Sequence, residues 1–186
     1  MSAIHPQITA IIDEFESARA RLHRLTKATP ASRWSERADP QRWSVAECIA
    51  HLNLTSRAYL PLLGKGISDA RSAGVPVPRR YRRDPIGWAL WIAMGPPVRF
   101  GRMRTLALFI PSGGLPRDAT VSEFDRLQDE QIAFAREANG LPLGAVRVQS
   151  PFDARVTYNL YSCLTILPRH QHRHLWQGEG IWANKS

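Results

Sequence analysis

The sequence contains few cysteines, few lysines and no long hydrophobic run. Its 186 residues include only two cysteines, Cys48 and Cys163, which excludes a disulfide-stapled secreted scaffold and favours a reducing compartment. The longest apolar run, residues 86–95, is about half of the roughly 20 residues that a membrane span needs. Residues 1–7 lack the basic stretch and apolar segment of a signal peptide. We therefore expect a cytoplasmic protein without a membrane partner.

The composition is that of a globular protein. Hydrophobic residues make up 44% of the chain and charged residues 22%, which excludes a disordered or collagen-like chain. The sequence shows no internal repeat and no low-complexity tail. Because domains average about 150 residues, residues 1–186 are predicted to form a single domain with a self-sufficient core.

Positive charge is in excess and is carried mainly by arginine. Lysine and arginine total 25 against 16 acidic residues, which gives a net charge of +9. Such a balance indicates an anionic partner, nucleic acid or acidic lipid, or else a solvated basic surface. The one dense cluster is residues 79–83, Arg-Arg-Tyr-Arg-Arg. No nucleic-acid-binding motif frames this cluster, so nucleic acid is not the expected main partner.

Four segments have the apolar periodicity of helices. The first covers residues 8–25 and ends before Pro30. The second begins at Ser44, where Ser44 and Glu47 form a predicted capping box, and Pro61 is expected to kink or interrupt it. The third is predicted to begin with a second capping box, residues 120–123. The fourth covers residues 157–177, with a local bend at Pro168. No convincing strand pattern is present, so we predict an all-α four-helix bundle.

A long, proline-rich connection, residues 74–119, separates the second and third helices. Connections of this length are usually functional or carry structure of their own. Residues 86–94 are predicted to form a short helix that presents Trp88, Trp91 and Ile92 to the bundle. We interpret the connection as a strap over one end of the bundle; a lid or a dimer surface is the alternative.

Two histidines on the last helix and one on the second are candidate metal ligands. His170 and His174 lie four residues apart, so they share one helical face. Leu160, Cys163 and Leu167 continue this face, which places it toward the core. His172 is expected to face solvent, and His51 lies near the buried stripe of the second helix.

Buried imidazoles require polar partners, because an unpaired polar group in a core costs a few kcal/mol. A divalent metal supplies one partner, and a third imidazole from a facing helix completes a three-histidine site. Such a site keeps at least one coordination position open for water or substrate, as catalytic sites do. From spacing alone, hydrogen-bonded or solvent-facing histidines remain the alternative.

Residues 43–52 (Trp-Ser-x-x-Glu-x-x-x-His-Leu) and 170–177 (His-x-x-Arg-His-x-x-Gln) together resemble the two-part signature of the DinB/YfiT-like superfamily. The resemblance covers most of the chain. It implies a four-helix bundle of up-down-down-up topology that is often dimeric. It also implies a divalent metal, commonly zinc or nickel, held by His51, His170 and His174.

The same resemblance implies an enzyme that acts on a small molecule, since characterised relatives include thiol S-transferases and isomerases that use low-molecular-weight thiols. We expect a metal-activated water or thiol, in a thiol S-transferase or a hydrolase. No glutamate adjoins a candidate histidine as in His-Glu-x-x-His, so no metalloprotease-like base is visible. Cys48 and Cys163 are each a fourth ligand, a reactive thiol or a core residue. Gln177 either orients a ligand or fills the end of the bundle.

The alternative function is a non-enzymatic, stress-related binding module. In this hypothesis the metal is structural or absent, and the basic cluster at residues 79–83 contacts nucleic acid or another anionic partner. Phosphate-driven binding of this kind weakens steeply with salt, which separates it from the enzyme hypothesis.

Overall fold

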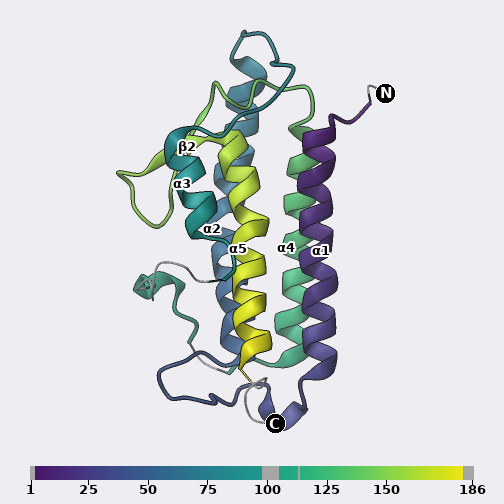
Figure 1. Ribbon diagram of the computed structural model, residues 1–186, viewed down its shortest axis with the longest axis vertical. Helices are drawn as coiled ribbons and strands as arrows, with labels where there is room; N and C mark the ends of the chain where they lie inside the picture. Colours follow the sequence, from purple (N-terminus) through teal and green to yellow (C-terminus); the bar gives the residue numbers. More distant parts are fainter. Residues whose placement is uncertain (1–2, 98–104, 113, 182–186) are drawn as a thin grey trace.

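The computed structural model describes residues 3–97, 105–112 and 114–181, and its four long helices form a bundle (Figure 1). These are α1 (Pro6–Ala28), α2 (Val45–Ser72), α4 (Arg117–Glu137) and α5 (Leu160–Gly180). Shorter elements are η1 (Ala31–Arg33), α3 (Pro85–Ala93), η2 (Ala107–Phe109), β1 (Arg147–Gln149) and β2 (Thr157–Asn159). Within the described ranges, no helix has both the length and the apolar character that a membrane span requires.

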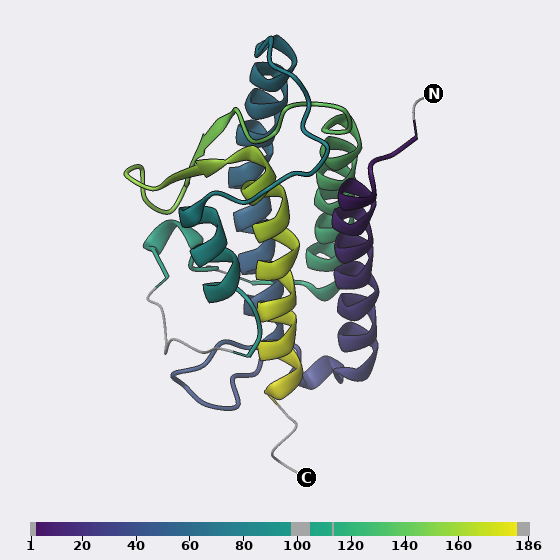
Figure 2. The same ribbon diagram turned by 45° about the horizontal axis from the view of Figure 1, so that its top comes forward.

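The bundle has the predicted up-down-down-up topology. Arg117, at the start of α4, donates to the Thr29 carbonyl just beyond the end of α1 at 2.7 Å, so α1 and α4 are antiparallel. Arg71 and Glu137 pair at 2.6 Å near the ends of α2 and α4, which therefore run in the same direction. Helix α5 runs alongside α1 in the direction of α1 (Figures 1 and 2).

Helix α2 begins as predicted and ends at Ser72, just before the predicted connection. The Glu47 backbone N–H donates to Ser44 Oγ at 3.2 Å, and the Ser44 N–H donates to Glu47 Oε2 at 2.8 Å, which confirms the capping box. Pro61 does not interrupt the helix. Its ring removes one backbone donor, and the contacts of α2 with α4 and α5 hold the rest of the helix in place.

Two predicted helix starts were wrong. Helix α4 begins at Arg117, three residues before the predicted cap, and the Thr120 hydroxyl donates to the Pro116 carbonyl at 2.8 Å. This hydroxyl is therefore engaged inside the first turn and caps nothing. Residues 157–159 form strand β2, which pairs antiparallel with β1, and α5 begins only after Asn159, whose side chain accepts from the Ser162 N–H at 2.8 Å.

The core consists of two apolar clusters stacked along the bundle axis. The larger cluster joins α1, α2, α4 and α5 with the hairpin, and includes Phe15, Leu63, Tyr158, Leu160 and Leu164. The smaller cluster lies at the end where α1 finishes and α2 begins, and includes Leu22, Trp34, Ile49, Phe124 and Leu175. The candidate histidines project from turns of α2 and α5 near this smaller cluster.

The first part of the connection crosses the end of the bundle where α1 and α5 begin, as predicted: the Tyr81 N–H donates to Gln7 Oε1 at 2.8 Å, and the Tyr81 ring stacks on Tyr161. Helix α3 and η2 then lie along the side of the bundle formed by α2 and α5 (Figures 1 and 2). Helix α3 packs closely on α5, because a Cβ at Gly87 would lie 2.0 Å from Ser162 Oγ. Trp88 does not face the bundle as predicted, since it is 58% exposed. Trp91 is half-buried against arginines of the connection and of α5.

Candidate metal centre

The three predicted histidines meet inside the bundle. His51 comes from the second turn of α2, and His170 and His174 come from successive turns of α5. Nε2 of His170 lies 3.4 Å from Nε2 of His51 and 3.0 Å from Nε2 of His174. All three side chains are buried, and their ligand nitrogens lie within 4.8 Å of one another.

The protonation pattern of these rings leaves lone pairs facing one another. Nδ1 of His51 lies 2.8 Å from the Phe109 carbonyl oxygen. A carbonyl only accepts, so Nδ1 carries the proton and Nε2 of the neutral His51 ring presents a lone pair. Nε2 of His170, which faces Nε2 of both neighbours, has at most one proton to donate. Hydrogen bonds among the three rings therefore cannot satisfy every facing nitrogen, whereas a shared cation can.

The surroundings keep the three imidazoles neutral. Burial lowers the pKa of His51 and lowers the pKa of His170 and His174 well below the usual range. The other histidines and the positive charge of Arg173 lower the pKa of His170 and His174 further. Neutral imidazole is the form that binds a metal, so the site need release few protons when a cation enters.

The donor set fits a divalent cation. Three imidazole nitrogens suit zinc or nickel and leave coordination positions open. Nδ1 of His174 is buried and has no hydrogen-bond partner among the described residues, so it is available to a group that would orient this ring behind the metal. Gln177, one turn farther along α5, lies close enough to oppose part of the downward shift in the pKa of His174.

Three aromatic side chains line the histidine cluster. The Trp43 ring centroid lies 4.9 Å from that of His51 and 5.8 Å from that of His174. The ring centroids of Phe109 and Phe152 lie 4.3 Å apart. Phe109 adjoins His51, and Phe152 adjoins His170. These rings limit access of water to the nitrogens, which strengthens electrostatic interactions there.

Periodicity could not reveal these neighbours. Phe109 lies in η2, 58 residues after His51, and Phe152 lies between β1 and β2. Trp43 precedes the capping box within the recognised motif, but no spacing rule assigned it to the cluster. Only the path of the connection and of the hairpin brings the three rings together.

Neither cysteine nor any acidic residue of the described ranges joins the cluster. Glu47 pairs with Arg37 and with the Ser44 backbone, which accounts for its carboxylate. Cys48 and Cys163 are fully buried. Burial raises the pKa of Cys48 to about 12 and raises that of Cys163 as well, so both behave as core residues and not as reactive thiolates.

The prediction that His172 faces solvent was wrong. Its ring lies against α1, where Nε2 is 3.1 Å from a Glu14 carboxylate oxygen, and Arg21 donates to the His172 backbone carbonyl at 3.2 Å. Because α5 contacts α1 as well as α2, the face opposite His170 is also covered.

The basic cluster at residues 79–83 is divided by the fold. Arg79, Arg80 and Arg82 are exposed, while Tyr81 is buried. Arg83 turns inward and donates to Thr165 Oγ1 at 2.8 Å. The cluster therefore does not present four guanidinium groups on one surface.

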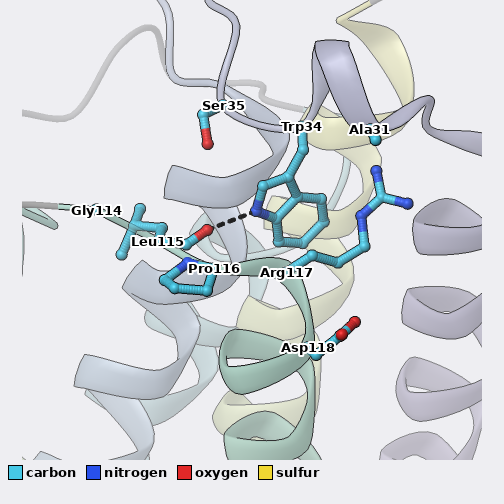
Figure 3. Close-up of a pocket in the computed structure, with 8 residues that line it drawn as sticks. All are labelled: Ala31, Trp34, Ser35, Gly114, Leu115, Pro116, Arg117 and Asp118. Atoms are coloured by element: carbon cyan, nitrogen blue, oxygen red, sulfur yellow. Dashed lines mark hydrogen bonds between the residues drawn. The ribbon is translucent and has the colours of Figure 1, made fainter.

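A shallow depression at the end of the bundle lies apart from the histidines (Figure 3). Trp34 forms one wall and donates through Nε1 to the Leu115 carbonyl at 2.7 Å, and the Arg117 guanidinium lies 5.1 Å from its ring centroid. None of the three histidines lines this depression. Its Trp34–Leu115 and Trp34–Arg117 contacts join α4 to the segment after α1, which is a structural role.

Fold and site together define a four-helix-bundle protein with a candidate three-histidine metal centre. The chain belongs to the DinB superfamily, whose family model matches residues 14–177. A solved structure with the same fold is YfiT from Bacillus subtilis, described as a probable metal-dependent hydrolase with an unusual four-helix bundle topology. The two chains share 15% identity with a TM-score of 0.65, over 99% of this chain and 90% of YfiT. No functionally curated protein matches the sequence.

Proposed function

We propose that this protein is a metal-dependent enzyme whose divalent ion, zinc or nickel, is held by His51, His170 and His174. The observation that carries the proposal is the convergence of three buried, neutral imidazoles whose facing nitrogens cannot all be satisfied by one another. The description of YfiT as a probable metal-dependent hydrolase supports it.

A divalent ion bound there would lower the pKa of a water ligand toward about 7, or bind a thiol as its thiolate. The protein supplies the orientation of the ligands, because the Phe109 carbonyl fixes the tautomer of His51. Trp43, Phe109 and Phe152 supply an apolar wall against which the carbon skeleton of a substrate can pack. Gln177 is placed to hydrogen-bond a group near His174.

Within this class we favour transfer of a low-molecular-weight thiol over hydrolysis. No carboxylate of the described ranges lies in the cluster to act as a general base. A thiol, with a pKa near 8.5, gives up its proton far more readily than water and needs no such base. Hydrolysis, the activity suggested by the YfiT description, is the other outcome of the same test.

Cobalt substitution tests the proposal. Metal-free protein is titrated with Co²⁺, and visible absorption reports coordination by imidazole nitrogens. We expect saturation at about one ion per chain, as three ligands make one site, and loss of the bands in His51→Ala. His23→Ala, which removes an exposed histidine on α1, is the matched control and should bind Co²⁺ normally.

A small thiol is then added to the cobalt-loaded protein. A new sulfur-to-cobalt charge-transfer band indicates thiol binding and supports thiol transfer, whereas no band together with ester hydrolysis supports the hydrolase. If wild type and His51→Ala give the same cobalt spectrum, the proposed function is wrong.

A further inference from the structure

Two arginines between the connection and α5 share one aromatic ring. The guanidinium carbons of Arg83 and Arg169 each lie 4.4 Å from the ring centroid of Trp91. Arg83 comes from the segment before α3, Trp91 from α3 itself, and Arg169 from α5. Gly95 closes one side, because a Cβ there would lie 2.3 Å from the Arg169 guanidinium.

These two cations have no acidic partner. No Asp or Glu of the described ranges pairs with Arg83 or Arg169, and residues 1–2, 98–104, 113 and 182–186 contain no Asp or Glu at all. Some other arginines of the bundle are paired with an acidic residue, as Arg147 is with Asp84 at 2.6 Å and Arg21 is with Glu179 at 2.6 Å. What distinguishes Arg83 and Arg169 from other arginines without an acidic partner is that both guanidinium groups lie against the same ring.

Several N–H groups of Arg83 and Arg169 also lack a hydrogen-bond acceptor among the described residues. Nε of Arg169 is buried and has no partner among the described residues. Arg83 uses only Nε, which donates to Thr165 Oγ1, so its two terminal amino groups remain available. Burial and, to a smaller extent, the neighbouring Arg169 charge lower the pKa of Arg83, while Tyr161 opposes part of this shift.

Desolvated cations that repel each other are costly unless an anion neutralises them. Trp91 offsets part of this cost through cation–π attraction to both guanidinium groups, and the Tyr161 ring, whose centroid lies 5.8 Å from the Arg83 guanidinium carbon, adds to it for Arg83. Both side chains remain partly exposed, so an anion can reach them. Planar guanidinium groups match the paired oxygens of a carboxylate or phosphate.

We propose that Arg83 and Arg169, with Trp91 between the connection and α5, form a binding site for the oxyanion group of a small molecule. Arg173, one turn beyond Arg169, is buried and donates to the Ala93 carbonyl at 2.7 Å; it extends the positive charge toward His174. The site uses none of the three histidines, so it stands whether or not they bind a metal.

Thermal unfolding at constant ionic strength tests this site. Sodium chloride is replaced stepwise by sodium phosphate, sulfate or succinate, with full-length wild type, Arg83→Gln and Arg169→Gln. Arg71→Gln is the matched control, because Arg71 is exposed and its partner, Glu137, lies on α4 and takes no part in the proposed site. With ligand at about 100 times its Kd, the Tm of a chain of this size should rise by roughly 5–10 °C.

We expect a saturable rise in wild type and in Arg71→Gln, and its loss in Arg83→Gln and Arg169→Gln. A larger response to phosphate and sulfate assigns the site to a phosphoryl-type group, and a larger response to succinate assigns it to a carboxylate. Calorimetric titration of wild type with the same anions gives the Kd without any variant. Arg169→Lys should weaken binding, because lysine keeps the positive charge but lacks the planar, paired N–H donors of the guanidinium group. No saturable rise in wild type, or an equal rise in all four proteins, would overturn the proposal.

Discussion

Acid should destabilise the metal-free protein through its buried histidines. His51, His170 and His174 are held neutral in the folded state, where burial lowers each pKa. In the unfolded chain each returns to a pKa near 6.5. Below that pH the unfolded chain binds more protons than the folded protein, so stability is lost as pH falls and is unaffected above it.

The magnitude follows from proton linkage. A histidine protonated only in the unfolded chain costs about 1.4 kcal/mol per pH unit below its unfolded pKa. Between about pH 8 and pH 5.5, three such histidines together cost up to about 4 kcal/mol. That is a large part of the roughly 5–15 kcal/mol by which domains are stable, so unfolding by urea in the presence of a chelator should resolve it.

Single variants identify the source of this loss. His170→Gln should reduce the acid-dependent loss by about a third, or roughly 1.4 kcal/mol at pH 5.5. His23→Gln, which changes an exposed histidine of α1, should leave the loss as in wild type. An identical pH dependence in wild type and in the triple variant of His51, His170 and His174 would show that these histidines do not cause the loss.

Three further predictions test the fold around the site. Ser44→Ala should cost about 1 kcal/mol in urea unfolding by removing the cap of α2, and an unchanged midpoint would contradict the cap's role. Gln171→Leu should cost roughly 1–3 kcal/mol, because it leaves the buried Gln128 amide without the partner that it contacts at 2.8 and 3.0 Å; a neutral effect would show that water replaces this partner. Cys48 should resist a thiol reagent in folded protein and react in urea, because burial raises its pKa to about 12; rapid labelling of the native state would contradict its burial.

The sequence predicted the helices wherever the local chemistry was unambiguous. Ser44 and Glu47 satisfy each other's backbone donors, so the start of α2 could be read directly. Thr120 offered a similar pattern, but Pro116 starts α4 one turn earlier and takes the Thr120 hydroxyl as a donor. The β1–β2 hairpin was missed because its strands have three residues each, too few to show an alternating pattern.

Only those parts of the candidate site that depend on local spacing or on a recognised motif could be predicted from the sequence. The four-residue spacing of His170 and His174 and the continuous stripe before them fixed their common face, and the motif at residues 43–52 brought in His51. The Phe109 carbonyl, the Trp43 and Phe152 rings and the inward turn of Arg83 depend on the path of the connection and the hairpin. Long-range packing of this kind leaves no periodic signal in the chain.

Metal content decides whether the three histidines form a metal site. Protein purified without an affinity tag is analysed for metals, wild type beside the double variant His170→Ala/His174→Ala, before and after incubation with zinc or nickel. We expect about one divalent ion per wild-type chain, as three imidazoles form a single site, and none in the double variant. Equal metal in both proteins, or none in wild type after incubation, would contradict it.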